Sequence, residues 1–286
     1  MTPSTARAVH ARPIKPESPL RTALKRLKFR LLVRFKPRKN RVYTQFFRFP
    51  NQYKALEDKV LPRLRSPDAG PTAAPLDIIM FGCSTGAEAF SLASFLRDRF
   101  GALRFRIRAF DIVPEVIEQA RRAIFSRDEV YQGPFVSEDL VAKTFEPIDT
   151  GFRVRPEIVE TVTFATGNIL DENLIRQLGQ ADLVFAQNML FHLPPPKARE
   201  AFNRLVELLA PKSALFINGM DTDMRVALTK RHNLEPLDYL VEEIHEDARV
   251  NLGSSWASTY WGREPFSRKS KDWLRQFCTI YFRSSS

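Results

Sequence analysis

The stretch Leu76-Asp-Ile-Ile-Met-Phe-Gly-Cys-Ser-Thr-Gly86 is followed directly by Ala-Glu-Ala-Phe-Ser-Leu-Ala-Ser-Phe-Leu96. Five of the first six residues are apolar, which predicts a buried strand, and Gly82 ends that run. The second stretch has the apolar spacing of a helix. Together they predict a strand, a glycine turn and a helix, which is the opening unit of an α/β fold. The apolar positions of the helix are Ala89, Phe90, Leu92, Ala93 and Leu96.

The same alternation continues along the chain. Short apolar runs, each read as a strand, are separated by stretches with helical spacing, one of which opens with Pro114 at an early helical position. Strands that alternate with helices of 10–15 residues predict right-handed βαβ units and a doubly wound, mostly parallel sheet. The expected strands are residues 105–110, 181–186, 213–217 and 277–282, and the expected helices are residues 114–124 and 196–209.

Residues 126–162 interrupt this rhythm with charged and turn-forming residues. They contain two short β-like pieces, Gly151-Phe-Arg-Val-Arg155 and residues 161–164. We therefore predict a small β insertion here.

The charge of the chain is uneven. The 286 residues carry a formal charge of +11, yet residues 1–41 alone contribute +12, so the remainder is close to neutral. An apolar stripe at helical spacing between basic residues predicts a basic amphipathic helix in this tail. Such a helix suits anionic lipid, nucleic acid or an acidic protein, or it simply packs on the body of the protein. The stripe consists of Leu20, Leu24, Leu27, Leu31 and Phe35.

Several classes of protein are excluded by composition. No apolar run approaches the roughly 20 residues of a membrane span, so we expect no transmembrane segment. The two cysteines, Cys83 and Cys278, lack the spacing of a metal site, so we expect neither a disulfide scaffold nor a metal. Reduced thiols fit a cytoplasmic protein.

Four of the expected strands end in residues suited to a ligand, and in an open α/β sheet ligands bind beyond those ends. At the first end Gly82, Ser84 and Gly86 allow close backbone approach. Asp111, 25 residues after Gly86, suits a carboxylate that binds both hydroxyls of a ribose. This spacing alone would equally serve a dinucleotide, but G-x-G-x-x-G and the P-loop lysine are absent. The other ends are Gly167-Asn-Ile-Leu-Asp171 and Gln187-Asn-Met-Leu-Phe-His192.

These segments resemble the CheR-type S-adenosylmethionine-dependent methyltransferases, which methylate glutamate side chains of chemotaxis receptors. Tyr43-Thr-Gln-Phe-Phe-Arg48 is similar to the family's Asn-Tyr-Thr-x-Phe-Phe-Arg, and Cys83-Ser-Thr-Gly-Ala-Glu-Ala-Phe-Ser91 is similar to its Cys-Ser-Thr-Gly-Glu-Glu-Pro-Tyr-Ser. Asp111-Ile, Asn168-Ile-Leu170 and the segment from Gln187 to His192 match its later landmarks in order. The resemblance covers about three fifths of the chain, from residue 42 to residue 219.

The resemblance implies a class I methyltransferase-like fold that binds S-adenosylmethionine. With the tail described above, we expect three parts: a basic tail and helix over residues 1–41, a cofactor-contacting segment and linker helix over 42–75, and a Rossmann-like domain over 76–286. The resemblance further implies that Thr44 and Arg48 reach the methionine end of the cofactor and that Asp111 holds the ribose. The remaining implied cofactor contacts are Gly82, Ser84, Gly86 and Glu88 near the glycine loop, Asn168 with Ile169, and Gln187 with Asn188.

The chain also departs from the family pattern. Val42 replaces an asparagine, Ala87 replaces the first glutamate of a pair, and His192 stands where a tyrosine is usual. The N-terminal helical domain of relatives is reduced to the basic helix, and some sixty residues follow the last landmark. Use of the cofactor is therefore better supported than the identity of the methyl acceptor.

The expected function is O-methylation of a protein carboxylate, which needs no general base because glutamate is ionised near pH 7. Arg48, or Arg63 or Arg65 in the next helix, would orient the acceptor carboxylate, and the basic helix would recognise an acidic, receptor-like partner. Alternatively, His192 would deprotonate a hydroxyl or amine of a small molecule or protein. The aromatic residues Trp256, Tyr260 and Trp261 would then line a pocket. A non-enzymatic binder of nucleic acid is the third hypothesis, but the nearly neutral body argues against a nucleic-acid partner. Contact of the basic helix with a membrane surface would be weak.

Overall fold

The structure is a computed structural model, and it describes Leu20, Leu24 and residues 44–65, 74–250, 266–269 and 271–284. Leu20 and Leu24 are helical, but the rest of the expected basic helix lies outside the described residues. Val42, Tyr43 and the aromatic group around Trp256 also lie outside them. No helix within the described ranges is long and apolar enough to cross a membrane.

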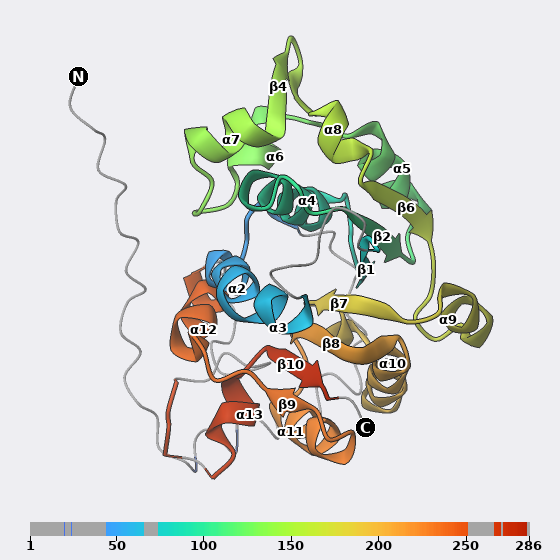
Figure 1. Cartoon of the computed structure of the whole chain (residues 1–286), viewed down its shortest axis with the longest axis vertical. Helices are drawn as coiled ribbons and strands as arrows, with labels where there is room; N and C mark the ends of the chain where they lie inside the picture. The colour runs from blue at the N-terminus through green and yellow to red at the C-terminus, as the bar shows by residue number, and fades with distance from the viewer. Residues whose placement is uncertain are drawn as a thin grey trace.

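A seven-stranded sheet forms the centre of the molecule, with the order β6-β2-β1-β7-β8-β10-β9 (Figure 1). Strands β6, β2, β1, β7 and β8 are parallel, whereas β10 runs antiparallel to both of its neighbours. The order reverses between β1 and β7, which is where an open α/β sheet binds its ligand. The strands are β1 (Leu76–Phe81), β2 (Phe105–Asp111), β6 (Val162–Thr166), β7 (Ala181–Gln187), β8 (Leu209–Asn218), β9 (Glu235–Pro236) and β10 (Ile280–Arg283). This arrangement is the class I methyltransferase fold.

Both faces of the sheet are buried, which explains why the central strands read as continuous apolar runs. Ile78 and Met80 of β1 point into one hydrophobic cluster together with Phe90 of α4. Their neighbour Ile79 points into the other cluster together with Phe202 of α10. Because side chains alternate along a strand, each strand contributes to both cores. The helices around the sheet are α4 (Ala87–Arg99), α5 (Pro114–Arg122), α9 (Glu172–Leu178), η2 (Leu190–His192), α10 (Pro195–Glu207), α11 (Thr222–Arg231), α12 (Val241–Val250) and α13 (Trp273–Phe277).

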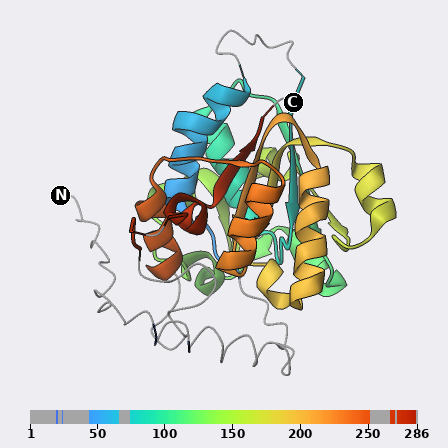
Figure 2. The same cartoon turned by 90° about the horizontal axis from the view of Figure 1, so that it is seen from below.

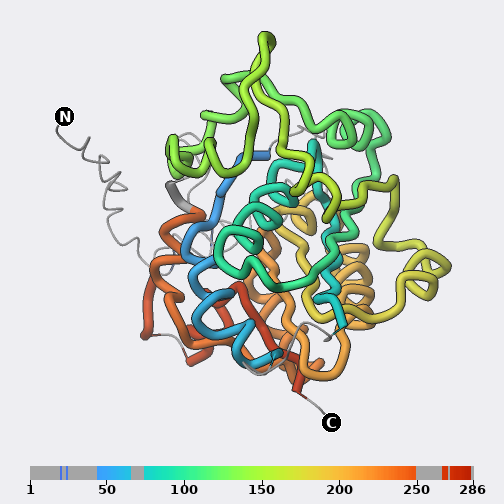
Figure 3. The backbone as a smooth tube through the Cα atoms, turned by 45° about the horizontal axis from the view of Figure 1, so that its top comes forward, coloured from blue at the N-terminus to red at the C-terminus, as the bar shows by residue number. Residues whose placement is uncertain are grey.

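The insertion forms a separate three-stranded antiparallel sheet at one end of the molecule (Figure 3). Its strands flank three short helices, and its aromatic residues pack against the main body: the Phe125 ring lies 4.9 Å from that of Phe46. Of residues 161–164, which the sequence placed in the insertion, 162–164 lie instead in β6, the parallel edge strand of the main sheet, and Thr161 directly precedes it. A short β-like sequence pattern does not indicate to which sheet the strand belongs. Here the pairing of β6 with β2 places it in the main sheet. The insertion contains β3 (Ile124–Phe125), α6 (Arg127–Tyr131), α7 (Glu138–Thr144), β4 (Phe145–Ile148), β5 (Gly151–Val154) and α8 (Pro156–Val159).

The N-terminal segment is attached to the body by specific contacts. The backbone N–H of Phe47 donates to the hydroxyl of Ser91 in α4 at 2.9 Å. Helix α2 (Pro50–Ala55) then continues through the π-helical η1 (Leu56–Val60) and α3 (Leu61–Leu64) and runs beside the C-terminal strand (Figure 2). Asn51 of α2 donates to Asp247 of α12 through both its backbone N–H and its side chain, each at 3.0 Å. The segment thus brings residues 44–48 to the ends of the central strands.

Candidate functional site

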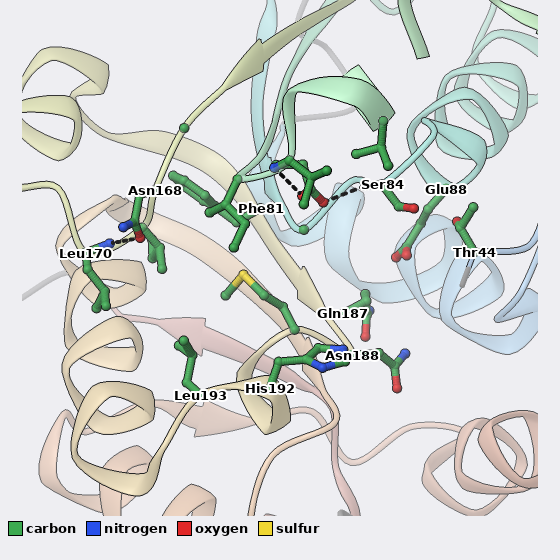
Figure 4. A pocket seen from close by; sticks show the side chains of 18 of the residues that line it. Thr44, Phe81, Ser84, Glu88, Asn168, Leu170, Gln187, Asn188, His192 and Leu193 are labelled. Atoms are coloured by element: carbon green, nitrogen blue, oxygen red, sulfur yellow. Dashed lines mark hydrogen bonds between the residues drawn. The ribbon is translucent and has the colours of Figure 1, made fainter. Parts of the chain in front are cut away.

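A pocket of about 280 Å³ lies beyond the C-terminal ends of β1, β2, β6 and β7 (Figure 4). It sits at the place where the sheet order reverses, and it brings together residues from the N-terminal segment, four strand ends and α10. Twenty residues line it: Thr44, Arg48, Phe81, Gly82, Ser84, Glu88, Asp111, Ile112, Val113, Val116, Gly167, Asn168, Ile169, Leu170, Gln187, Asn188, Met189, His192, Leu193 and Lys197. The sequence predicted eleven of these as site residues.

The turn between β1 and α4 forms one wall of the pocket. Gly82 and Ser84 both have positive φ, +74° and +50°, and a side chain on Gly82 would meet Met189 at 3.0 Å. Gly86, the third residue expected here, does not line the pocket. Gly86 is the N-cap residue of α4 and has a φ of +88°. A Cβ at this position would lie 2.9 Å from the ring of Phe164. Gly86 therefore serves the turn and the helix packing.

Asp111 is fixed at the end of β2 by two backbone groups. Its Oδ2 accepts a hydrogen bond from the N–H of Ser84 at 2.9 Å, and its Oδ1 accepts one from the N–H of Val113 at 3.1 Å. Because each carboxylate oxygen can accept two hydrogen bonds, capacity remains for a ligand. Asp111 consequently ties the turn after β1 to the turn after β2 and presents a preoriented acceptor to the pocket.

Glu88, in the first turn of α4, lies beside Thr44 at one end of the pocket (Figure 4). It is half-buried. Burial raises the pKa of this carboxyl to about 7, and the nearby guanidinium of Arg48 opposes that rise. A carboxyl with such a pKa is poised to become fully ionised when a cation binds beside it. A positive charge on a ligand at this end of the pocket would therefore lower the pKa of Glu88 again.

The end of β6 supplies Asn168 and Ile169. The side-chain oxygen of Asn168 accepts a hydrogen bond from the N–H of Leu170 at 3.0 Å, which shapes the turn. Gly167 allows this turn because a Cβ there would lie 2.8 Å from the ring of Phe110. The amide nitrogen of Asn168 takes no part in this bond. Asn168 lies on the side of the pocket away from Glu88 (Figure 4).

Gln187 and Asn188 lie at the end of β7. Asn188 has a positive φ of 52°, and its N–H donates to the carbonyl of Asn218 at 3.0 Å. Gly219 makes this close approach feasible, since a Cβ on it would lie 2.6 Å from the Cα of Asn188. His192 follows at the end of η2, exposed at the pocket mouth, with its ring 4.1 Å from that of Phe191.

Several lining residues were not predicted from the sequence. Ile112 directly follows Asp111 and stays 56% exposed, which is unusual for a large aliphatic side chain beside a strand end. That combination of an apolar residue after a strand-terminal acid is the signal that sequence reading could have used. The other unpredicted lining residues are Phe81, Val113, Val116, Gly167, Leu170, Met189, Leu193 and Lys197.

Two residues expected near the acceptor do not line the pocket. Arg63 pairs with Glu235 through two hydrogen bonds of 2.9 and 2.6 Å. Arg65 pairs with Asp182 at 3.3 Å, at the opposite end of β7 from the pocket. Both arginines therefore hold helix α3 against the sheet, and Arg48 is the one that reaches the pocket.

Residues 42–236 match the family described as CheR methyltransferase, SAM binding domain. A probable biofilm formation methyltransferase WspC of Pseudomonas putida is 32% identical over 195 residues, which is 68% of this chain and 44% of that protein. The chemotaxis protein methyltransferase of Escherichia coli is 30% identical over 60% of this chain and 58% of its own length. The chain thus spans less than half of the length of the WspC protein that it matches.

Likeness to solved structures is more distant. The trans-methyltransferase CalH in complex with SAH is 18% identical and has a TM-score of 0.35, with 71% of this chain and 44% of that chain covered. The fold class therefore rests on the strand order given above and on the family match.

The side chains of the pocket fit S-adenosylmethionine, the cofactor of this family. Three buried polar atoms that line it, the hydroxyl of Ser84, Oε1 of Gln187 and Nδ2 of Asn188, have no hydrogen-bond partner among the described residues. Such orphaned atoms are costly unless a ligand completes them. A cofactor that carries hydroxyls, an ammonium, a carboxylate and an adenine offers suitable partners, and the apolar Ile112 and Val116 suit its adenine.

Proposed function

Because the chain belongs to the CheR methyltransferase family, we propose that it transfers a methyl group from S-adenosylmethionine to a glutamate carboxylate of a protein substrate. The names of its relatives support a protein substrate, since they include chemotaxis protein methyltransferases of Listeria monocytogenes and Vibrio cholerae. The acceptor would be an acidic, receptor-like protein. We place this reaction in the cytoplasm, where such a substrate and the reduced Cys83 and Cys278 would both be found.

The pocket residues divide into an adenosine end and a methionine end in this proposal. Asp111 would hold the ribose hydroxyls, and Asn168 with Ile169 would contact the adenine. Ser84 and Gly82 would line the cofactor along the turn after β1. At the methionine end, Thr44 and Arg48 would bind the carboxylate, Glu88 would bind the ammonium, and Gln187 with Asn188 would lie nearest the sulfonium.

The observation that carries the choice of acceptor is the charge of the remaining wall. That wall, formed by η2 and α10, contributes His192, Leu193 and Lys197, and no carboxylate among the described lining residues comes from it. The two acids of the pocket lie on the other walls. A basic mouth favours an anionic acceptor and repels a cationic one.

The chemistry asks little of this chain beyond positioning. When bound, S-adenosylmethionine supplies an electrophilic methyl group on a sulfonium. A glutamate carboxylate is already ionised near pH 7, so no residue has to remove a proton. Arg48 and Lys197 would orient the acceptor oxygen, and the walls described above would hold the reacting atoms in line and exclude water.

The proposal can be tested with tritiated S-adenosylmethionine and a chemotaxis-receptor cytoplasmic fragment. A tritiated methyl ester that releases labelled methanol in base should form, and it should be lost when the methyl-accepting glutamates of the fragment are replaced by glutamine. Lys197→Gln should raise the KM for the fragment severalfold, because an exposed ion pair changes affinity by less than about tenfold. Lys212→Gln, at an exposed lysine outside the pocket, is the matched control. Labelling that is independent of the glutamates would refute the proposed acceptor.

A second acceptor class is favoured by His192 alone. An imidazole at the pocket mouth could take a proton from a hydroxyl or amine, as either reaction would require. In that case the labelled product would be stable to base, and His192→Gln would abolish its formation. The two acceptor classes are thus separated by one chemical property of the product.

A further inference from the structure

A buried relay of hydrogen bonds reaches the pocket from two distant segments. Nε2 of Gln187 donates to Oε1 of Gln52 at 2.7 Å, and Nε2 of Gln52 donates to the hydroxyl of Thr279 at 2.8 Å. The three side chains are 5%, 3% and 5% exposed. The relay therefore joins β7, helix α2 and the residue that precedes β10 within the protein interior.

The relay has a direction that matters at the pocket. A carboxamide has a donor side and an acceptor side, and rotating it exchanges the two. Because Gln52 accepts from the nitrogen of Gln187, the oxygen of Gln187 is the side left over. That oxygen is buried and has no hydrogen-bond partner among the described residues, although Gln187 lines the pocket. The side chain is thus held with an unsatisfied acceptor.

We propose that Gln52 is a positioning residue that holds the Gln187 oxygen toward the sulfonium of the cofactor, so that the pocket favours charged S-adenosylmethionine over its neutral product. An acceptor oxygen stabilises a nearby positive charge through its dipole, and low dielectric strengthens this effect. If Gln52 did not accept from the Gln187 nitrogen, the carboxamide could turn and present N–H groups to the cation instead. Gln52 itself does not line the pocket, so it acts only through Gln187.

Neighbouring contacts keep the relay in place. Asn51, the residue before Gln52, is bonded twice to Asp247 of α12 at 3.0 Å. The carbonyl of Thr279 accepts from the N–H of Ile217 in β8 at 2.8 Å. The middle of the relay and its end at Thr279 are consequently anchored to elements that do not line the cofactor pocket, which is what a positioning residue requires.

The experiment is a pair of affinities measured by calorimetry on the same protein sample, one for S-adenosylmethionine and one for S-adenosylhomocysteine. The product lacks the sulfonium charge but keeps the adenosine, ammonium and carboxylate. The ratio of the two affinities therefore isolates the interaction with the sulfonium, and partial unfolding of a variant cancels in it.

We expect Gln187→Met to lower the ratio of S-adenosylmethionine to S-adenosylhomocysteine affinity about tenfold, the size of a hydrogen bond to a charged group. Gln52→Met, which removes the partner that orients Gln187, should lower it severalfold. Gln52→Glu should preserve the ratio or raise it, because a carboxylate still accepts from the Gln187 nitrogen. Thr279→Val should lower the ratio, but by less than Gln52→Met does.

Gln45→Met is the matched control. Gln45 is another buried glutamine of the same segment, but it donates to the carbonyl of Gln132 and does not line the pocket. Its replacement should leave the ratio unchanged. If Gln52→Met and Gln187→Met weaken both ligands equally, the relay is only structural and the inference is overturned. The inference rests on the proposed cofactor site, and failure of the wild type to bind either ligand would instead overturn that site.

Discussion

The two ends of the pocket each present one carboxylate, and the two are held in different ways. At the end that we propose for adenosine, Asp111 accepts hydrogen bonds from the backbone N–H groups of Ser84 and Val113, at 2.9 and 3.1 Å. At the end that we propose for methionine, burial raises the pKa of Glu88 to about 7 against the effect of Arg48. One acid is fixed by the main chain and the other is poised to change its protonation state.

This difference separates the end of the pocket at which binding depends on geometry from the end at which it depends on charge. The Asp111 carboxylate is placed before any ligand arrives, so its contribution comes from orientation. Glu88 gains most when a cation compensates for its burial, so its contribution depends on pH and on what is bound. Substitutions at the two acids should therefore weaken cofactor binding in distinguishable ways.

The largest effect should come from Asp111→Ala. The variant loses the charged acceptor that we propose for two ribose hydroxyls, and it also releases the N–H of Ser84, a residue with positive φ. Hydrogen bonds to a charged group are worth about 1.5–3 kcal/mol each, so we expect at least about a hundredfold loss of S-adenosylmethionine affinity by calorimetry.

Asp171→Ala is a suitable control for that experiment. Asp171 caps α9 by accepting from the N–H groups of Asn173 and Leu174, near the pocket but outside its lining. Loss of the cap should cost about 1 kcal/mol of stability with little change in affinity. If Asp111→Ala bound the cofactor as well as this control does, the ribose assignment would fall.

The second effect concerns Glu88 and pH. Below pH 7 Glu88 takes up a proton and no longer attracts the ammonium of the cofactor, so affinity should fall about tenfold from pH 8 to pH 6. Glu88→Gln cannot titrate, and its affinity should be lower at pH 8 and vary little over this range. A wild type and a Glu88→Gln variant with the same pH profile would show that another group causes the dependence.

The third effect concerns the stability of the cofactor-free protein. It is smaller, and here Glu88→Gln is expected to stabilise the protein rather than to weaken it. The folded pKa of Glu88 lies above its ordinary value of 4.5, so its ionisation destabilises the cofactor-free protein progressively as pH rises from 4.5 through 7. Glu88→Gln removes that cost. Scanning calorimetry without cofactor should show the variant melting a few degrees higher than the wild type at pH 8, with no difference near pH 4. A variant that melts lower at pH 8 would contradict the burial of this charge.

Much of the fold could be predicted from the sequence because both faces of the sheet are buried. The apolar runs at β1, β7 and β8 and the helical spacing of α4 are strong local patterns. The sheet to which residues 161–164 belong could not be predicted, because pairing between β6 and β2 is a long-range property. Helix α11 was also missed; its apolar residues form no clear stripe, and its buried residues include Arg225 and two threonines.

The site was less accessible to sequence reading. Residues at strand ends stand out because glycine, aspartate and asparagine interrupt apolar runs. Nine such residues and their neighbours meet in one pocket together with Thr44 and Arg48. Motif position alone could not separate Gly82, which faces the pocket, from Gly86, which faces Phe164. Nor could it show that Arg63 is paired with Glu235 while Arg48 reaches the pocket, or that Gln52 bonds Gln187 across 135 residues. Each of these depends on contacts between segments far apart in the chain.

The smallest effect should come from His192, which belongs to neither end and lies on the wall assigned to the acceptor. If the acceptor is a carboxylate, the imidazole has no proton to remove, and His192→Gln should lower kcat only a few fold without removing a limb of the pH profile. If the acceptor is a hydroxyl or amine, kcat should fall by about a hundredfold or more, and the limb of the pH profile that reports the general base should disappear. The cofactor affinities that separate Asp111 from Glu88 should be unchanged in either case. The pH profile of kcat in this one variant therefore tests whether the third wall of the pocket, like Asp111, acts by position alone.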